Sequence, residues 1–126
     1  MTTSQRALAG FFTVAGIMHF VIPRTYEAIV PEWIPISARD AVVWSGAAEI
    51  AGGLAVLLPS TRSFARWWLI GVLVAVYPAN VHMAVNPEQI RGLDTERLPR
   101  WSLWGRLPLQ FAAMWWVWRA TAPDSA

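Results

Sequence analysis

Four long apolar stretches, each holding at least one strongly polar side chain, limit what this 126-residue chain can fold into more than any other feature. They cover residues 7–22, 41–59, 67–85 and 107–118, and none contains a lysine. Apolar runs of about this length are typical of membrane-spanning helices, because the backbone must satisfy its own hydrogen bonds across the hydrocarbon core. An ionisable group within such a run is costly without a partner, so it is a candidate functional residue.

The composition agrees with a membrane protein. Hydrophobic residues make up 56% of the chain and charged residues 14%, whereas soluble domains carry roughly 25% charged residues. Several of the nine tryptophans stand at the ends of the apolar stretches, where rings suit the headgroup region. The alternative, a soluble helical bundle, would need a polar face on each helix, and these stretches are apolar all round.

Other residue patterns exclude whole classes of function. The chain has no cysteine, which rules out disulfides, cysteine–zinc sites and covalently attached haem. The ten arginines are scattered at segment edges and no nucleic-acid motif is present, so nucleic acid is not an expected partner. Without a glycine-rich phosphate loop, no nucleotide cofactor is expected, and no cofactor is built into the chain.

The pattern predicts an all-α fold, an integral membrane four-helix bundle that forms a single domain over residues 1–126. The predicted spans are about 4–22, 40–58, 64–85 and 101–119. Between Arg106 and Arg119 lie only twelve residues, about 18 Å of helix, which is short of a ~30 Å hydrocarbon core. The last span is therefore expected to begin near Trp101 and to carry Arg106 inside it.

Caps and prolines predict where the helices end. Ser4 is the expected cap of the first helix, and Pro23 ends that helix and opens a loop over 23–37. Ser37 with Asp40 resembles a capping box at the start of the second helix. Residues 59–66 are expected to form a tight turn and residues 86–100 a polar loop, while Pro78 is expected to kink the third helix.

The polar residues lie in the same half of their helices. Counted from the side of the 23–40 and 86–100 loops, His19 lies about 6 Å deep, Asn80 about 10 Å and Glu49 about 13 Å. Small residues occupy the same helix faces, and these let membrane helices approach closely. They are Gly16, Gly46, Gly53, Ala113 and the row Gly71, Ala75, Ala79, Met83. The polar groups are therefore predicted to meet in one half of the bundle.

The predicted ligand-binding candidates are His19, Tyr26, Glu49, Asn80, His82, Arg106 and Gln110. Glu49 is either a structural acid, paired with Arg106 or hydrogen-bonded to Asn80 or a histidine, or an acid that moves protons. Arg106 is alternatively an anchor that reaches outward to the interface. The histidines are core side chains or hydrogen-bond a ligand's oxygen. Two histidines and one glutamate without a spacing motif do not predict a metal site.

Tyr26 lies in the first loop together with Trp33, and both residues have two interpretations. They either cover the pocket or anchor the interface.

Four stretches carry a resemblance to a known family. They are GIMHFVIPRTYEAIVPEWIP, SGAAEIAGGLAVLLPSTRSFARWW, VYPANVHMAV and WGRLPLQ, and together the similarity covers nearly the whole chain. In these the chain resembles the DoxX-like family of small four-span membrane proteins. The resemblance implies a prokaryotic membrane bundle, and some relatives are linked to quinone-dependent oxidation of sulfur compounds or to quinone stress. It supplies no catalytic set of residues.

Two functions follow from different classes. In the first, the bundle binds a quinone-like or other amphipathic molecule in a redox-linked system. In the second, it is an accessory or assembly subunit of a membrane oxidoreductase complex, has no catalytic site of its own, and has a membrane or peripheral oxidoreductase as its partner. An oligomer of the chain is a further expected assembly. Transport is weaker, because the polar residues cluster at one end. The expected location is the prokaryotic cell membrane, multi-pass, with both termini cytoplasmic because the turn at Arg62 lacks acids.

Overall fold

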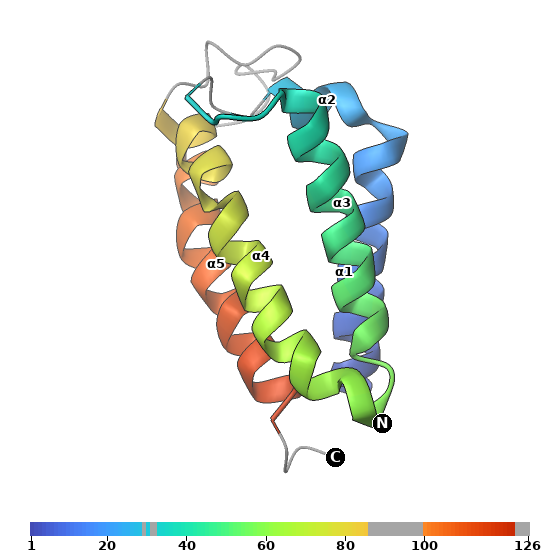
Figure 1. Ribbon diagram of the computed structural model, residues 1–126. Coiled ribbons are helices and arrows are strands. Elements are labelled where there is room, and N and C mark those ends of the chain that lie inside the picture. The colour runs from blue at the N-terminus through green and yellow to red at the C-terminus, as the bar shows by residue number, and fades with distance from the viewer. Residues whose placement is uncertain (29, 31–32, 86–99, 123–126) are drawn as a thin grey trace.

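The fold consists of helices. The computed structural model describes residues 1–28, 30, 33–85 and 100–122, and within them it contains five α-helices and no strand. The helices are α1 (Thr3–Val21), α2 (Pro23–Ala28), α3 (Ala38–Ala55), α4 (Pro59–Val85) and α5 (Arg100–Ala120) (Figure 1). This confirms the predicted all-α class, and each of the four predicted stretches overlaps one of the four long helices.

The four long helices form two pairs. α1 packs along α3, α4 packs along α5, and α3 also contacts α4. The pairs lie further apart at the end that carries α2 than at the opposite end, where α3 leads into α4 (Figure 1). At that opposite end Gln5 donates from Nε2 to the carbonyl of Ala120 over 2.9 Å, and Trp116 donates from Nε1 to Ser4 Oγ, also over 2.9 Å. The start of α1 is thereby joined to the end of α5.

The apolar core fills the end of the bundle away from α2. Leu8 and Phe12 of α1 pack there with Leu69 of α4 and Val117 of α5, and all four are at most 1% exposed. Large apolar side chains also cover the outside of the bundle. The exposed ones include Phe11, Val14, Ile17, Val43, Leu54, Phe64, Trp67, Val74, Leu109, Phe111 and Trp115. Exposed side chains of this size are unusual over the whole surface of a soluble monomer.

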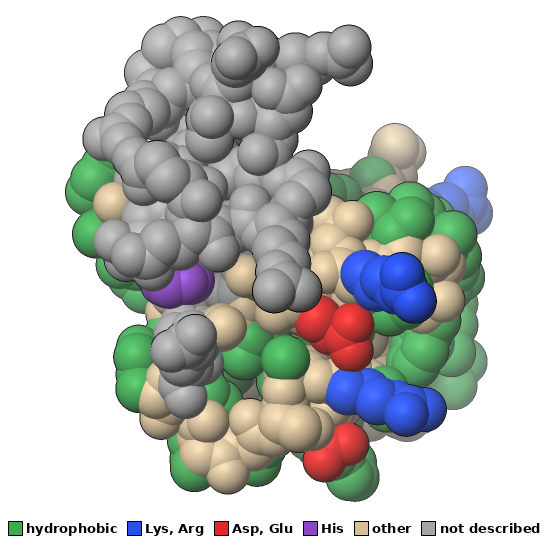
Figure 2. Space-filling view, turned by 90° about the horizontal axis from the view of Figure 1, so that it is seen from above, with side chains coloured by type: hydrophobic (Ala, Val, Ile, Leu, Met, Phe, Trp, Pro, Cys, Tyr) green, Lys and Arg blue, Asp and Glu red, His purple; other side chains and the backbone are tan. Residues whose placement is uncertain are grey.

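Charged side chains gather at the α2 end. Seen from there, acidic and basic side chains lie close together on one part of the surface (Figure 2). α2 contributes Arg24 and Glu27, and the first turn of α3 contributes Arg39 and Asp40. Charges of both signs at one end leave the long sides of the helices apolar.

The predicted cap of α1 is wrong, whereas that of α3 is confirmed. Thr2, and not Ser4, caps α1, because Gln5 at the third helical position completes a capping box with it. Gln5 N donates to Thr2 Oγ1 over 3.1 Å, and Thr2 N donates to Gln5 Oε1 over 3.0 Å. At the start of α3, Ser37 Oγ accepts from Asp40 N over 3.1 Å.

The predicted turn over residues 59–66 is also wrong, because these residues form the first turns of α4. Proline fits the first position of a helix, where its missing N–H would have no partner. The side chains that follow satisfy the last carbonyls of α3. Thr61 Oγ1 donates to Ala55 O over 2.7 Å and Arg62 Nε donates to Val56 O over 3.0 Å.

Proline also explains α2, which the prediction of a loop over 23–37 missed. Pro23 ends α1 as predicted, and it then occupies the first position of the short helix α2. Pro78 lies inside α4. The last helix, α5, begins at Arg100, next to Trp101 as predicted, and it contains both Arg106 and Pro108. Apart from Arg100, which begins α5, the predicted polar loop 86–100 lies outside the described residues.

One described helix meets the length and composition expected of a membrane span. It is the part of α4 over Pro59–His82, which has 24 residues and a mean hydropathy of 1.3 in its most apolar window.

Candidate functional site

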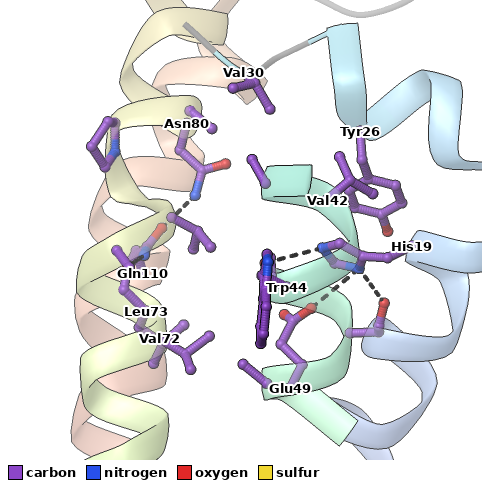
Figure 3. A pocket seen from close by; sticks show the side chains of 18 of the residues that line it. His19, Tyr26, Val30, Val42, Trp44, Glu49, Val72, Leu73, Asn80 and Gln110 are labelled. Atoms are coloured by element: carbon purple, nitrogen blue, oxygen red, sulfur yellow. Dashed lines mark hydrogen bonds and ion pairs between the residues drawn. The ribbon is translucent and has the colours of Figure 1, made fainter. Parts of the chain in front are cut away.

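A cavity of about 550 Å³ lies toward the α2 end of the bundle, with α1 and α3 on one side and α4 and α5 on the other (Figure 3). All five helices and the segment before α3 contribute to its lining. Most of the wall is apolar. Six of the seven predicted residues line it, namely His19, Tyr26, Glu49, Asn80, Arg106 and Gln110. The seventh, His82, does not line the cavity.

Glycines bring α1 against α3 and thereby place the polar residues of these helices. A Cβ atom at Gly16 would lie 2.6 Å from the carbonyl oxygen of Gly46, which is too close for any side chain. A Cβ atom at Gly53 would lie 2.7 Å from Thr13 Oγ1. The predicted small-residue faces of these two helices are confirmed, and they hold His19 directly beside α3.

The predicted small-residue row on α4 is wrong at its first residue. Gly71 is exposed, and a Cβ atom there would meet nothing within 4 Å, whereas Ala75 and Ala79 line the cavity. The reason is that α4 turns Leu69 and Leu73 toward the core, so Gly71 between them faces outward.

His19 and Glu49 form an acid–imidazole pair within the cavity wall. They are 7% and 9% exposed, and His19 Nδ1 lies 3.2 Å from Glu49 Oε2. The same nitrogen lies 2.8 Å from the carbonyl oxygen of Ala15, and Nε2 lies 3.4 Å from Ser45 Oγ. Because a carbonyl can only accept, Nδ1 carries a proton and directs it to Ala15. Glu49 Oε2 is consequently buried without a hydrogen-bond donor among the described residues.

Tyr26 covers the imidazole. Its ring stacks on His19 with centroids 4.0 Å apart and an angle of 19° between the planes (Figure 3). Burial raises the pKa of Tyr26, the negative charge of Glu49 raises it further, and the positive charge of Arg106 opposes both effects. Tyr26 was predicted either to cover the pocket or to anchor the interface, and its position over His19 agrees with the first role.

A chain of carboxamides forms the facing wall. Asn80 Nδ2 donates to Gln110 Oε1, and Gln110 Nε2 donates to the carbonyl of Leu73. Gln110 is 5% exposed, so its amide is fixed inside the wall. These contacts join α4 to α5 and hold Asn80 at the edge of the cavity, across from His19 and Glu49 (Figure 3).

Arg106 and His82 stand apart from the acid. Arg106 is exposed, and the described residues form no ion pair between it and Glu49, which lies beside the His19 imidazole instead. His82 is partly buried on α4 outside the cavity, so the two histidines and Glu49 do not converge. Across the described part of the chain, no group of three or more His, Asp or Glu side chains could hold a metal ion.

The sequence interpretation missed Ser45 and the two carbonyls that orient the site. Ser45 precedes Glu49 by four residues, so it lies on the same helix face and that spacing could have identified it. The sequence could not identify the carbonyls of Ala15 and Leu73 as hydrogen-bond acceptors for these side chains, because every residue has a backbone carbonyl. Their roles depend on the side chains that the helix packing brings to them.

Comparison with known proteins gives one match. A family model described as "Domain of unknown function (DUF8561)" matches residues 8–121, which is most of the chain and includes every candidate residue. Neither a curated protein nor a solved structure matches the chain.

Proposed function

We propose that this chain, which belongs to the DUF8561 family of domains of unknown function, is a small integral membrane protein whose cavity binds a quinone-like amphipathic molecule. Kinship with the DoxX-like family is part of the same proposal, as are a multi-pass arrangement in a prokaryotic cell membrane and cytoplasmic termini. The redox-linked setting follows from that kinship. The membrane and the cavity are supported by separate observations.

The distribution of side chains supports the membrane. The bundle buries polar residues such as Glu49 and Gln110 while it exposes large apolar ones along every long helix. At the end away from α2, the Arg66 guanidinium lies 3.2 Å from the ring centroid of Trp118. Arginine and tryptophan together suit the level of the headgroups. Lipid would cover the apolar sides between this end and the charged α2 end.

The observation that carries the ligand proposal is the pair of polar groups on facing walls of an apolar cavity. The acid–imidazole pair lies on α1 and α3, and Asn80 with Gln110 lies on α4 and α5. A volume of about 550 Å³ is within the range of roughly 300–1,000 Å³ found for small-molecule sites. A quinone has the matching chemistry, since two oxygens lie at opposite ends of an apolar ring. Glu49 and Asn80 would hydrogen-bond those oxygens, His19 would hold Glu49 in place, and Glu49 would exchange protons with the ligand.

The test is binding of decylubiquinone and of its two-electron reduced form to the purified chain in lipid nanodiscs, with empty nanodiscs as the blank. We expect at least one of the two forms to bind above the blank. Ala48→Phe should weaken that binding at least tenfold, because Ala48 lines the cavity and a phenyl ring there would occupy it. Ala47→Phe is the matched control, since Ala47 is exposed on the same helix and does not line the cavity.

Two outcomes would contradict the proposal. One is that neither form binds above the blank, and the other is that the variants at 47 and 48 bind equally well. The accessory-subunit alternative predicts the first outcome, because the polar residues would then only hold the helices together. In that case a partner protein should co-purify with the chain in mild detergent.

A further inference from the structure

The direction of the hydrogen bonds in the α4–α5 wall is set by one backbone carbonyl. Leu73 O can only accept, so Gln110 must turn its NH₂ group toward it and its Oε1 toward Asn80. Asn80 must then turn its own NH₂ group toward Gln110. Its Oδ1 accepts no hydrogen bond from the described residues, and it points into the cavity (Figure 3). This wall therefore presents an acceptor.

A second backbone carbonyl sets the direction in the facing wall. Ala15 O takes the Nδ1 proton of His19 in either protonation state of the ring, and Nε2 faces Ser45. His19 thus has no free N–H for a ligand. Glu49 lies beside it, and its buried Oε2 accepts no hydrogen bond from the described residues. This wall also presents an acceptor.

The remaining polar groups of the cavity do not change the finding that each wall presents a hydrogen-bond acceptor. The hydroxyls of Ser45 and Tyr26 can rotate to donate or to accept. Arg106, which can only donate, lines the cavity but is exposed. A ligand between the walls would meet Asn80, whose direction is fixed by the fold, and Glu49, which only accepts while it is ionised.

From this we infer that the cavity selects the reduced, dihydroxy form of its quinone-like ligand, because two acceptors, Asn80 Oδ1 and the ionised Glu49 carboxylate, need two donors. One ligand hydroxyl donates to the Glu49 carboxylate and the other donates to Asn80 Oδ1. A quinone would instead place a carbonyl oxygen against each acceptor. The inference rests on the proposed function and adds to it the redox state that the site prefers.

The experiment compares three ligands with the same substituted ring and alkyl chain in the nanodisc assay, under anaerobic conditions. They are decylubiquinol, decylubiquinone and the 1,4-dimethyl ether of the quinol, which cannot donate. We expect the quinol to bind at least tenfold more tightly than either of the others. A tenfold preference for the reduced form raises the two-electron potential of the bound couple by about 30 mV. Glu49→Gln should reduce the preference, because an amide can donate to a carbonyl, whereas His82→Ala should leave it unchanged.

The outcomes separate this inference from the proposed function. A preference smaller than tenfold, or a reversed one, overturns the inference while binding itself still supports a quinone-like site. Absence of binding by all three ligands overturns both. The comparison with the dimethyl ether uses the unmodified chain, so it holds even if a variant does not fold.

Discussion

Gly46 packs against His19 so closely that a Cβ atom at position 46 would lie 2.7 Å from the Cβ atom of His19. The same added atom would lie 3.0 Å from the carbonyl oxygen of Gly16, so it is confined on two sides by α1. The position of the imidazole in the cavity wall therefore depends on the absence of a side chain on α3. Stability and ligand geometry are coupled at this one contact.

Replacing Gly46 should separate α1 from α3. We expect Gly46→Val to destabilise the bundle by about 1–3 kcal/mol, the range typical of overpacking, and to weaken ligand binding because His19 moves away from Glu49. Thermal unfolding in detergent and the nanodisc assay would measure the two effects. Gly71→Ala is the control, because nothing lies within 4 Å of its added Cβ atom. Equal melting temperatures for both variants would argue against close packing at Gly46.

The sequence predicted the class of fold and the convergence of most candidate residues for a physical reason. A helix has a fixed rise per residue, so distance from Pro23 or from Asp40 gives depth without any knowledge of packing. His19, Glu49 and Asn80 lie in the same half of their helices by this count, and they line one cavity. Glycines at a three- or four-residue spacing from them identified the close faces of α1 and α3.

What the sequence could not give was the direction in which each helix turns and the choice among partners. His82 lies two residues beyond Asn80, about 200° around a helix, so the cavity that receives one does not receive the other. Glu49 pairs with His19 and not with Arg106, because the glycines bring α1 close while Arg106 lies exposed on α5. Both outcomes depend on packing between helices that are distant in sequence.

The stability of the bundle should depend on the NH₂ group of Gln110. In Gln110→Glu, at a pH at which the carboxyl group is ionised, a carboxylate would face the carbonyl of Leu73 with no hydrogen to donate, although the size of the side chain is kept. We expect a loss of about 1–3 kcal/mol of stability, the cost of an unsatisfied buried polar group, and weaker ligand binding as Asn80 loses its orientation. Thermal unfolding and the nanodisc assay test this. Leu109→Met, at the neighbouring exposed position, should change neither, and an unaltered melting temperature for Gln110→Glu would refute the proposed orientation.

Tyr26 should titrate later than an ordinary tyrosine, whose pKa is about 10, because burial and the charge of Glu49 raise its pKa. A group with a raised pKa in the folded state stabilises that state below its unfolded pKa, and the contribution is lost as the pH rises through the folded value. Alkaline destabilisation should therefore be smaller in Tyr26→Phe. In a Tyr77→Phe background Tyr26 is the remaining tyrosine, so absorbance at the tyrosinate band follows it alone. Arg106→Gln should move the midpoint higher, and a midpoint at or below that of free tyrosine would contradict the burial.

Charge placed on the outside of α4 distinguishes a membrane bundle from a soluble one. Val74 lies within the candidate span Pro59–His82, and it is 57% exposed without any role in the core. In water Val74→Lys should be neutral, because the lysine would be solvated. In a bilayer a charge near the middle of a helix costs at least about 2.5–3.5 kcal/mol, so insertion should fall sharply. The measurement is the fraction of expressed chain that resists alkaline carbonate extraction from membranes.

Ser63→Lys is the matched control, because Ser63 is exposed in the first turns of the same helix, where lysine can reach the interface. If Val74→Lys and Ser63→Lys remain equally in the membrane fraction, α4 does not present this face to lipid.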